Sequence, residues 1–157
     1  MQIMKKIPLT QNKEALVDDE DFDLLSKLNW CVASNGYVVK RIKGKIVCLH
    51  RYIMNPKNKE WIDHINHDKL DNRRENLRIC TASQNSGNSI KTKSNTSSIY
   101  KGVCWDKQMK LWRCLITINY KLIFIGLFKE EFHAAMAYDI WAKELFGEFA
   151  KLNFKPI

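Results

Sequence analysis

The sequence of 157 residues predicts an α+β fold of short antiparallel strands and a few helices. Three observations predict it. β-favouring runs separated by glycine turns occupy residues 31–49. A strand-like run, a polar loop and a helical segment follow each other in residues 61–88. After Ile99, three β-patterned runs precede one long helical pattern. This length allows one compact domain or two small ones.

Residues 1–49 are predicted to form a small N-terminal α+β segment. Acidic residues open the run VDDEDFDLLSKLNW, in which Leu25 and Leu28 recur at helical spacing. The pair Asn35-Gly36 then marks a hairpin turn between two strand-like runs. We expect this segment to pack against the stretch that follows it.

Residues 61–88 place Asp63 beside His64 on a short predicted strand, with Asn76 and Asn85 following. A neutral imidazole can accept a proton from water near pH 7. Carboxylate and amide oxygens are ligands of hard divalent cations. Because side chains alternate along a strand, Asp63 and His64 should point to opposite faces unless the strand end twists or bulges. These residue types suit metal-assisted hydrolysis of a phosphodiester.

Taken singly, each of these residues has an ordinary explanation, since Asp-His pairs are usually on the surface and Asn-rich segments are usually turns. Together with the flanking sequence DNRRENLR, these residues resemble the catalytic motif of HNH endonucleases. The resemblance is to the Asn-ending variant found in phage and intron-encoded homing enzymes. It implies a ββα-metal hairpin within residues 50–90, which binds one divalent metal ion, Mg²⁺ or Mn²⁺.

The resemblance also implies a role for each residue of the motif. His64 would be the general base, Asp63 and Asn85 the metal ligands, and Asn76 a brace that bonds the loop backbone. His50, in LHRY, matches a His-Arg pair that often precedes the motif. It would either assist at the phosphate or pack under the hairpin. Three arginines near the motif would either contact DNA phosphates or form a solvated face, namely Arg73, Arg74 and Arg78.

Charge and cysteine usage narrow the class of protein further. The net charge of +9 and the pI near 9.3 indicate a polyanionic partner. The five cysteines include no CxxC pair, which predicts reduced thiols and no structural zinc. Because no long apolar run is present, we expect no membrane association. The family implies a phage or mobile-element protein in a bacterial cytoplasm, with no small-molecule cofactor.

The run KTKSNTSS, residues 91–98, contains no apolar residue and is predicted to be a basic linker. Residues 99–157 then form a separate predicted domain. Its YKGV, LITI, IGLF, HAAMAYD and FGEFAKLNF segments resemble the AP2 DNA-binding domain, in the form often appended to phage HNH enzymes. The resemblance implies a three-stranded antiparallel sheet packed on one helix.

Alternation along residues 112–119 predicts two different faces for the middle strand of this sheet. Trp112, Cys114, Ile116 and Ile118 should pack on the helix, while Arg113 and Thr117 should face outwards. The helix should present one stripe to the sheet. The predicted stripe consists of Ala134, Ala137, Tyr138, Trp141 and Leu145.

A three-stranded sheet can enter the major groove of DNA, where side chains reach base edges. Arg113 and Thr117 are predicted to read bases, with Lys101 and Trp105 at the margin and Lys121 on a phosphate. Several positions that carry arginine in plant AP2 domains differ here, which leaves readout by shape and charge as the alternative. These positions are Cys104, Asp106, Thr117 and Leu122.

The sequence therefore predicts a metal-dependent, site-directed DNA endonuclease of the homing type, acting as a monomer on double-stranded DNA and cutting one strand. The alternative is a DNA-binding regulator with an inactive nuclease fold. A protein that binds DNA through charge alone is a third possibility, and it would show a steep salt dependence without sequence preference.

Overall fold

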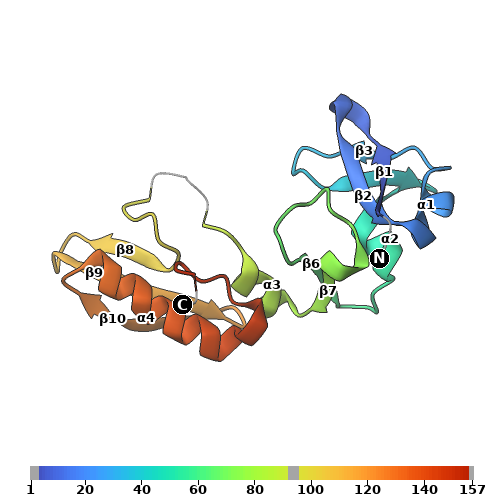
Figure 1. The fold of residues 1–157 in the computed structure, drawn as a ribbon. Helices are drawn as coiled ribbons and strands as arrows, with labels where there is room; N and C mark the ends of the chain where they lie inside the picture. The colour runs from blue at the N-terminus through green and yellow to red at the C-terminus, as the bar shows by residue number, and fades with distance from the viewer. Residues whose placement is uncertain (1–3, 92–95, 156–157) are drawn as a thin grey trace. The chain divides into compact units, whose positions relative to one another are not determined.

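A computed structural model describes residues 4–91 and 96–155 of the chain. Several small antiparallel sheets are combined with helices, which confirms the predicted α+β class (Figure 1). The chain divides into two compact units, Met1–Thr81 and Ala82–Ile157, and each is described by itself. Residues 92–95 of the predicted linker lie outside the described residues. In the described part of the chain, no helix is long and apolar enough to cross a membrane.

In the first unit, residues 4–81 form three small antiparallel sheets and two short helices. Its elements are β1 (Met4–Pro8), β2 (Glu14–Asp18), α1 (Asp19–Leu25), β3 (Cys31–Val32), β4 (Val38–Ile42), β5 (Lys45–Cys48), α2 (Leu49–Met54), β6 (Trp61–His64) and β7 (Leu77–Cys80), with 3-10 turns at Thr10–Asn12 and Arg74–Asn76. The sheets are β1–β2, β3–β4–β5 and β6–β7.

The turns of the β3–β4–β5 sheet follow from its glycines. Gly36 and Gly44 have φ angles of 84° and 80°, a region in which only glycine is free of strain. They lie between the paired strands, as the sequence predicts. The β1–β2 hairpin was not predicted, because its strands are five residues each and carry a weak alternating pattern.

One apolar core joins these elements. Val17 of β2, Leu25 of α1 and Leu49 of α2 are almost fully buried, and Ile62 and Leu77 bring the β6–β7 hairpin into the same cluster. Burial of such side chains is worth roughly 1.5–3 kcal/mol each. The N-terminal segment therefore packs against the β6–β7 hairpin, as expected from the sequence.

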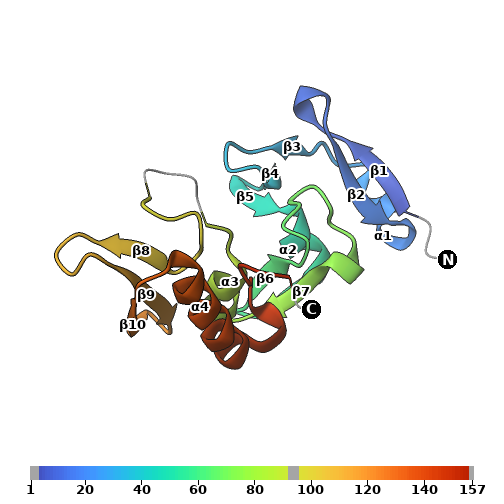
Figure 2. The same ribbon diagram turned by 60° about the vertical axis from the view of Figure 1, so that its left-hand side comes forward.

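The second unit is a three-stranded antiparallel sheet covered by one helix. Its elements are α3 (Ala82–Asn88), β8 (Val103–Asp106), β9 (Leu111–Ile118), β10 (Lys121–Phe128), α4 (Glu131–Phe146) and a 3-10 turn at Gly147–Phe149. The strand order is β10–β9–β8, and α4 lies across one face in both views (Figures 1 and 2). This confirms the predicted sheet and helix.

The two faces of β9 divide as predicted. Cys114 and Ile116 are buried under α4, whereas Arg113 and Thr117 are exposed. Cross-strand partners share a face, so Leu122, opposite Thr117, lies on the outer face as well.

The predicted stripe of α4 needs a correction. Trp141 is 40% exposed, and the buried side chains also include Ala135, Ala142 and Phe146. With about 100° per residue, this buried stripe is rotated by less than one residue step from the predicted one. The small Ala135 and Ala142 let α4 approach the sheet closely, and the bulky Trp141 is left towards solvent.

Candidate active site

His64 ends β6 in a buried pocket of aromatic and polar side chains. It is 5% exposed, and its ring centroid lies 5.0 Å from that of His50 and 5.9 Å from that of Tyr37. Its Nε2 lies 3.4 Å from Oδ1 of Asn72. Burial lowers the pKa of His64, and this outweighs the Asn72 hydrogen bond and nearby carboxylates, which raise it. The ring is therefore neutral at pH 7, the form a general base requires.

His50 lies in the first turn of α2 and packs under the same ring. It is 6% exposed, and its Nδ1 is buried without a hydrogen-bond partner. Burial, the neighbouring His64 and the charge of Arg51 lower the pKa of His50 to about 3. This placement matches the packing role, one of the two roles considered for His50.

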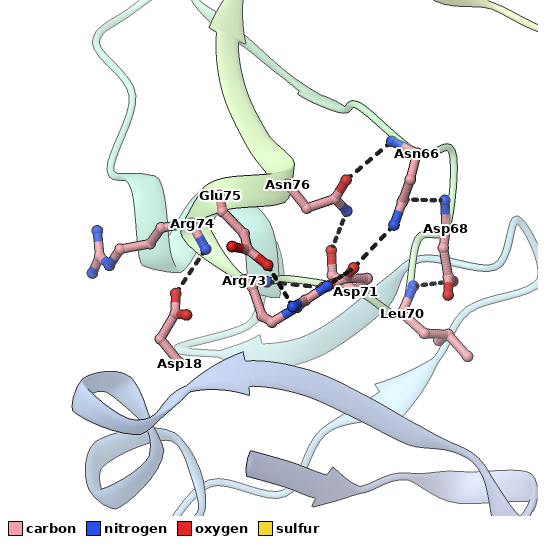
Figure 3. A network of polar contacts seen from close by, with 9 residues as sticks. All are labelled: Asp18, Asn66, Asp68, Leu70, Asp71, Arg73, Arg74, Glu75 and Asn76. Carbon is pink, nitrogen blue, oxygen red and sulfur yellow. Dashed lines mark hydrogen bonds and ion pairs between the residues drawn. The ribbon is translucent and has the colours of Figure 1, made fainter. Parts of the chain in front are cut away.

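The loop between β6 and β7 is held by the amide of Asn76 (Figure 3). Its Oδ1 accepts a hydrogen bond of 3.0 Å from the backbone N–H of Asn66, and its Nδ2 donates one of 2.8 Å to the backbone oxygen of Asp71. Besides these side-chain bonds, the backbone N–H of Ile65 donates to the backbone oxygen of Asn76 at 2.9 Å. These are the contacts that a loop brace requires.

Arg73 and Arg74 are bound to carboxylates of the protein. Arg73 donates from Nε and Nη2 to the two oxygens of Asp71, at 2.8 Å each. The side chain of Arg74 pairs with Asp21. Its backbone N–H donates to a carboxylate oxygen of Asp18 at 2.7 Å (Figure 3). The Asp71 partner lies two residues away in the sequence, but Asp18 and Asp21 lie in the N-terminal segment, where no sequence signal indicates the pairing.

Asp63 contacts a different partner from its neighbour His64. Its Oδ2 accepts hydrogen bonds of 2.9 and 2.8 Å from Nε and Nη2 of Arg78, which lies directly across the β6–β7 pair. The third arginine predicted to contact DNA thus pairs with the predicted metal ligand. The different partners of Asp63 and His64 agree with the alternation of side chains along β6.

A divalent metal would find suitable donor types in the predicted ligands. The carboxylate of Asp63 and the amide oxygen of Asn85 are hard donors of the kind that Mg²⁺ and Mn²⁺ bind. Asn85 lies on α3, which belongs to the second unit, and it is partly exposed. Its pairing with Asp63 stays a prediction.

The DNA-binding residues predicted in the second unit divide into two groups. Arg113 is 45% exposed in its side chain, although it forms an ion pair with Asp106, and Thr117 and Lys121 are exposed. Lys101 instead donates from Nζ to the backbone oxygens of Ser86 and Gly87, at 3.1 and 2.6 Å. Burial and the charge of Lys151 lower the pKa of Lys101 to about 8.

Trp105 also differs in position from Arg113. It lies opposite Trp112, with ring centroids 5.0 Å apart, and therefore shares the face of the sheet on which α4 packs. It remains 37% exposed at the end of the strand. The outer face carries Arg113 and Thr117 beside the apolar side chains of Leu122 and Phe124, which are 66% and 58% exposed.

Sequence reasoning missed two residues of the His64 pocket. Tyr37 and Asn72 both contact His64. The sequence pattern predicts only a strand at Tyr37, and it includes Asn72 only among the residues that flank the motif. The position of Asn72 within DNR, eight residues after His64, was the available signal.

Comparisons with known proteins found one family and two similar sequences. The family model described as HNH endonuclease matches residues 55–86. The chain is 36% identical over 154 residues to "Uncharacterized HNH endonuclease L560" of Acanthamoeba polyphaga mimivirus, covering 88% of this chain and 74% of that protein. It is 32% identical over 99 residues to "Protein 3.8" of Escherichia phage T7, covering 59% and 75%.

No solved structure matches the chain. The matched family model does not reach residues 99–157, so the AP2-type assignment stays a prediction. The mimivirus relative exceeds 30% identity, and the alignment covers most of both proteins. Together with the His64 pocket and the braced loop, this shows that the chain belongs to the HNH endonuclease family, which implies metal-dependent phosphodiester hydrolysis of DNA.

Proposed function

We propose that this chain is a site-directed DNA endonuclease of the homing type that cuts one strand with His64 as general base. The observation that carries the proposal is the buried His64, whose lowered pKa keeps it neutral, next to Asp63 and above a loop braced by Asn76. Such a ring can take a proton at neutral pH, and its fixed surroundings limit its orientation.

Asp63 and Asn85 would hold one divalent cation. When bound, the cation would neutralise charge on the scissile phosphate and its leaving oxygen. His64 takes a proton from a water molecule, and the resulting hydroxide oxygen bonds to phosphorus. The bond from phosphorus to the 3′ oxygen breaks, which leaves a 5′-phosphate and a 3′ oxyanion, and this oxyanion takes a proton from solvent to become the 3′-hydroxyl. Asn76 keeps the loop in place during this step.

The second unit would position the DNA. Arg113 and Thr117 lie on the outer sheet face, where Leu122 and Phe124 can contact thymine methyl groups or sugars. Lys121, exposed at the start of β10, would contact a phosphate. Because Asp106 pairs with Arg113, base readout requires Arg113 to leave this carboxylate or to share its guanidinium with a base.

A single catalytic motif in one chain favours a nick over a double-strand cut, and we propose that a monomer acts on DNA. The relative from Escherichia phage T7 supports an origin in a phage or a mobile element that acts in a bacterial cytoplasm. The net charge of +9 supports double-stranded DNA as the partner.

The test is nicking of supercoiled DNA that carries candidate target sites, with Mg²⁺ or Mn²⁺ and with a chelator. We expect nicking by the wild type with metal, none with the chelator, and none by His64→Ala. The exposed His133→Ala is the matched control and should nick like the wild type. Asp63→Ala and Asn85→Ala should lose nicking and keep DNA affinity.

Wild-type protein that binds DNA but leaves it uncut with either metal would support the alternative, a DNA-binding regulator with an inactive nuclease fold. Nicking that persists in His64→Ala would show that another group acts as the base. Joint loss of nicking and folding in Asp63→Ala would show that the Arg78 ion pair is the main role of Asp63.

A further inference from the structure

The side chain of Asn72 is fully buried between an N-terminal strand and His64. Its backbone N–H donates to the Leu16 oxygen of β2 at 2.8 Å, and the Leu16 N–H donates to the Leu70 oxygen at 2.9 Å. Leu16 and Asp71 thereby form a parallel β-bridge. Asn72 itself is 0% exposed. The strand β2 thus fixes the backbone of the residue that contacts His64.

The orientation of the Asn72 amide follows from its second contact. Its Nδ2 donates to the backbone oxygen of Lys69 at 3.2 Å. A backbone carbonyl can only accept, so the NH₂ group must face Lys69 and Oδ1 must face His64. Because Oδ1 can only accept, the Nε2 of a neutral His64 at 3.4 Å must carry the ring proton.

We infer that Asn72 is a positioning residue for the general base: it holds the His64 ring in the Nε2–H tautomer, so that Nδ1 is the atom that takes the proton from water. Strand β2 contributes to this positioning because it fixes the backbone of Asn72. This inference rests on the proposed function of His64. It assigns the N-terminal segment, which lies outside the matched residues 55–86, a part in the active site.

Two variants of Asn72 separate the hydrogen bond from simple packing. Asn72→Leu has a similar size but no acceptor, whereas Asn72→Asp keeps an acceptor oxygen towards His64. The tautomer is read from the ¹⁵N shifts of the His64 ring in the full-length protein. Nicking of supercoiled target DNA with Mg²⁺ is measured alongside, with His64→Ala as the reference for lost base catalysis.

We expect the Nε2–H tautomer in the wild type and in Asn72→Asp, and a mixture of tautomers in Asn72→Leu. Nicking by Asn72→Leu should fall about 10- to 100-fold, a part of the roughly 10²–10⁴-fold that a general base contributes. Asn72→Asp should nick at a rate closer to the wild type than to Asn72→Leu.

A wild-type ring in the Nδ1–H tautomer overturns the inference even if Asn72→Leu fails to fold. An Asn72→Leu protein that keeps the Nε2–H tautomer and the wild-type rate also overturns it. Nicking by His64→Ala at the wild-type rate would instead overturn the proposed function, and the ring tautomer would still decide whether Asn72 positions His64.

Discussion

The loop between β6 and β7 and the sheet–helix layer of the second unit are stabilised in different ways. The loop is held by buried polar groups, among them Asn72, Asn76 and Asp71, which bond to one another's backbone and to charged side chains. The sheet–helix layer is held by apolar contacts of Cys114, Ile116 and α4. Hydrogen bonds are directional, whereas apolar burial is not.

The two regions therefore tolerate different substitutions. In the loop, removing one partner leaves a buried donor or acceptor unpaired, and the penalty is the lost hydration of that group. In the sheet–helix layer the penalty comes from volume, because a close-packed interior cannot admit an extra atom without a shift. A catalytic ring needs the directional kind of support, and a binding surface needs only a stable layer behind it.

The largest expected effect is on the loop. Asn76→Ala leaves the Asn66 N–H and the Asp71 oxygen without their partners. We expect a loss of about 4 kcal/mol in the free energy of unfolding of the first unit, together with loss of nicking. Urea unfolding followed by amide NMR signals of this unit gives the first value. Asn58→Ala, at an exposed position, should change the free energy by less than about 0.5 kcal/mol.

Equal stability of Asn76→Ala and Asn58→Ala would contradict the view that polar bonds hold the loop. If Asn76→Ala kept its stability but lost nicking, Asn76 would act on the geometry of the site without supporting the fold.

The next largest effect is a loss of stability from overpacking in the second unit. At Gly102, with φ of 75°, a Cβ atom would lie 2.0 Å from Cδ2 of Tyr138 and 2.7 Å from the backbone oxygen of Leu115. We expect Gly102→Ala to cost about 3 kcal/mol, from overpacking and backbone strain together. Gly44→Ala has a similar φ of 80° and open space around it, and should cost about 1 kcal/mol in its own unit.

The measurement is urea unfolding, followed through amide signals of the unit that carries each change. Similar losses for Gly102→Ala and Gly44→Ala would mean that backbone strain dominates and that Tyr138 moves aside at little cost.

The weakest effect is a pH-dependent change in the free energy of unfolding, caused by His50. The pKa of His50 is lowered to about 3 in the folded protein, so below pH 6.5 the unfolded chain binds a proton that the folded chain does not. Stability is therefore lost as the pH falls from 6.5 towards 3, by about 2 kcal/mol at pH 5 from this group. His50→Phe should remove that part of the pH dependence, as measured by urea unfolding at pH 7 and 5.

His133→Ala is the control, because His133 is exposed on α4 of the other unit. It should leave the pH dependence close to that of the wild type. A His50→Phe protein that loses stability between pH 7 and 5 as steeply as the wild type would show that His50 becomes protonated without unfolding.

The fold could be predicted where local pattern and packing agree. The alternation of Cys114 and Ile116 with Arg113 and Thr117 placed the two faces of β9 correctly, because the strand is eight residues long and buried on one side. The buried stripe of α4 was predicted with an error of less than one residue step. The apolar pattern favoured Trp141 as a buried residue, but only the smaller Ala142 fits the narrow space against the sheet.

The roles of the candidate site residues stay predictions from the motif, whereas the contacts of their side chains come from the structure alone. The spacing of the motif residues and the sequence around them indicated His64 and Asn76. The hydrogen bonds of Asn76 have the form expected of a brace. The arginines were expected to face solvent or phosphate, but Arg74 pairs with Asp21, 53 residues earlier in the sequence. A single sequence contains no signal for such a long-range pairing.

Motif spacing in the sequence indicated the family and the residues suited to the chemistry, and hydrophobic periodicity indicated most strands and helices but not the β1–β2 hairpin, because spacing and periodicity are local properties. The sequence patterns did not indicate that β2 contacts the loop, that Asn72 faces His64 or that Lys101 is held against α3, and these contacts follow from how the chain packs. The contact of β2 with the loop joins segments distant in the chain, and all three contacts form only when burial brings unpaired polar groups within hydrogen-bonding distance.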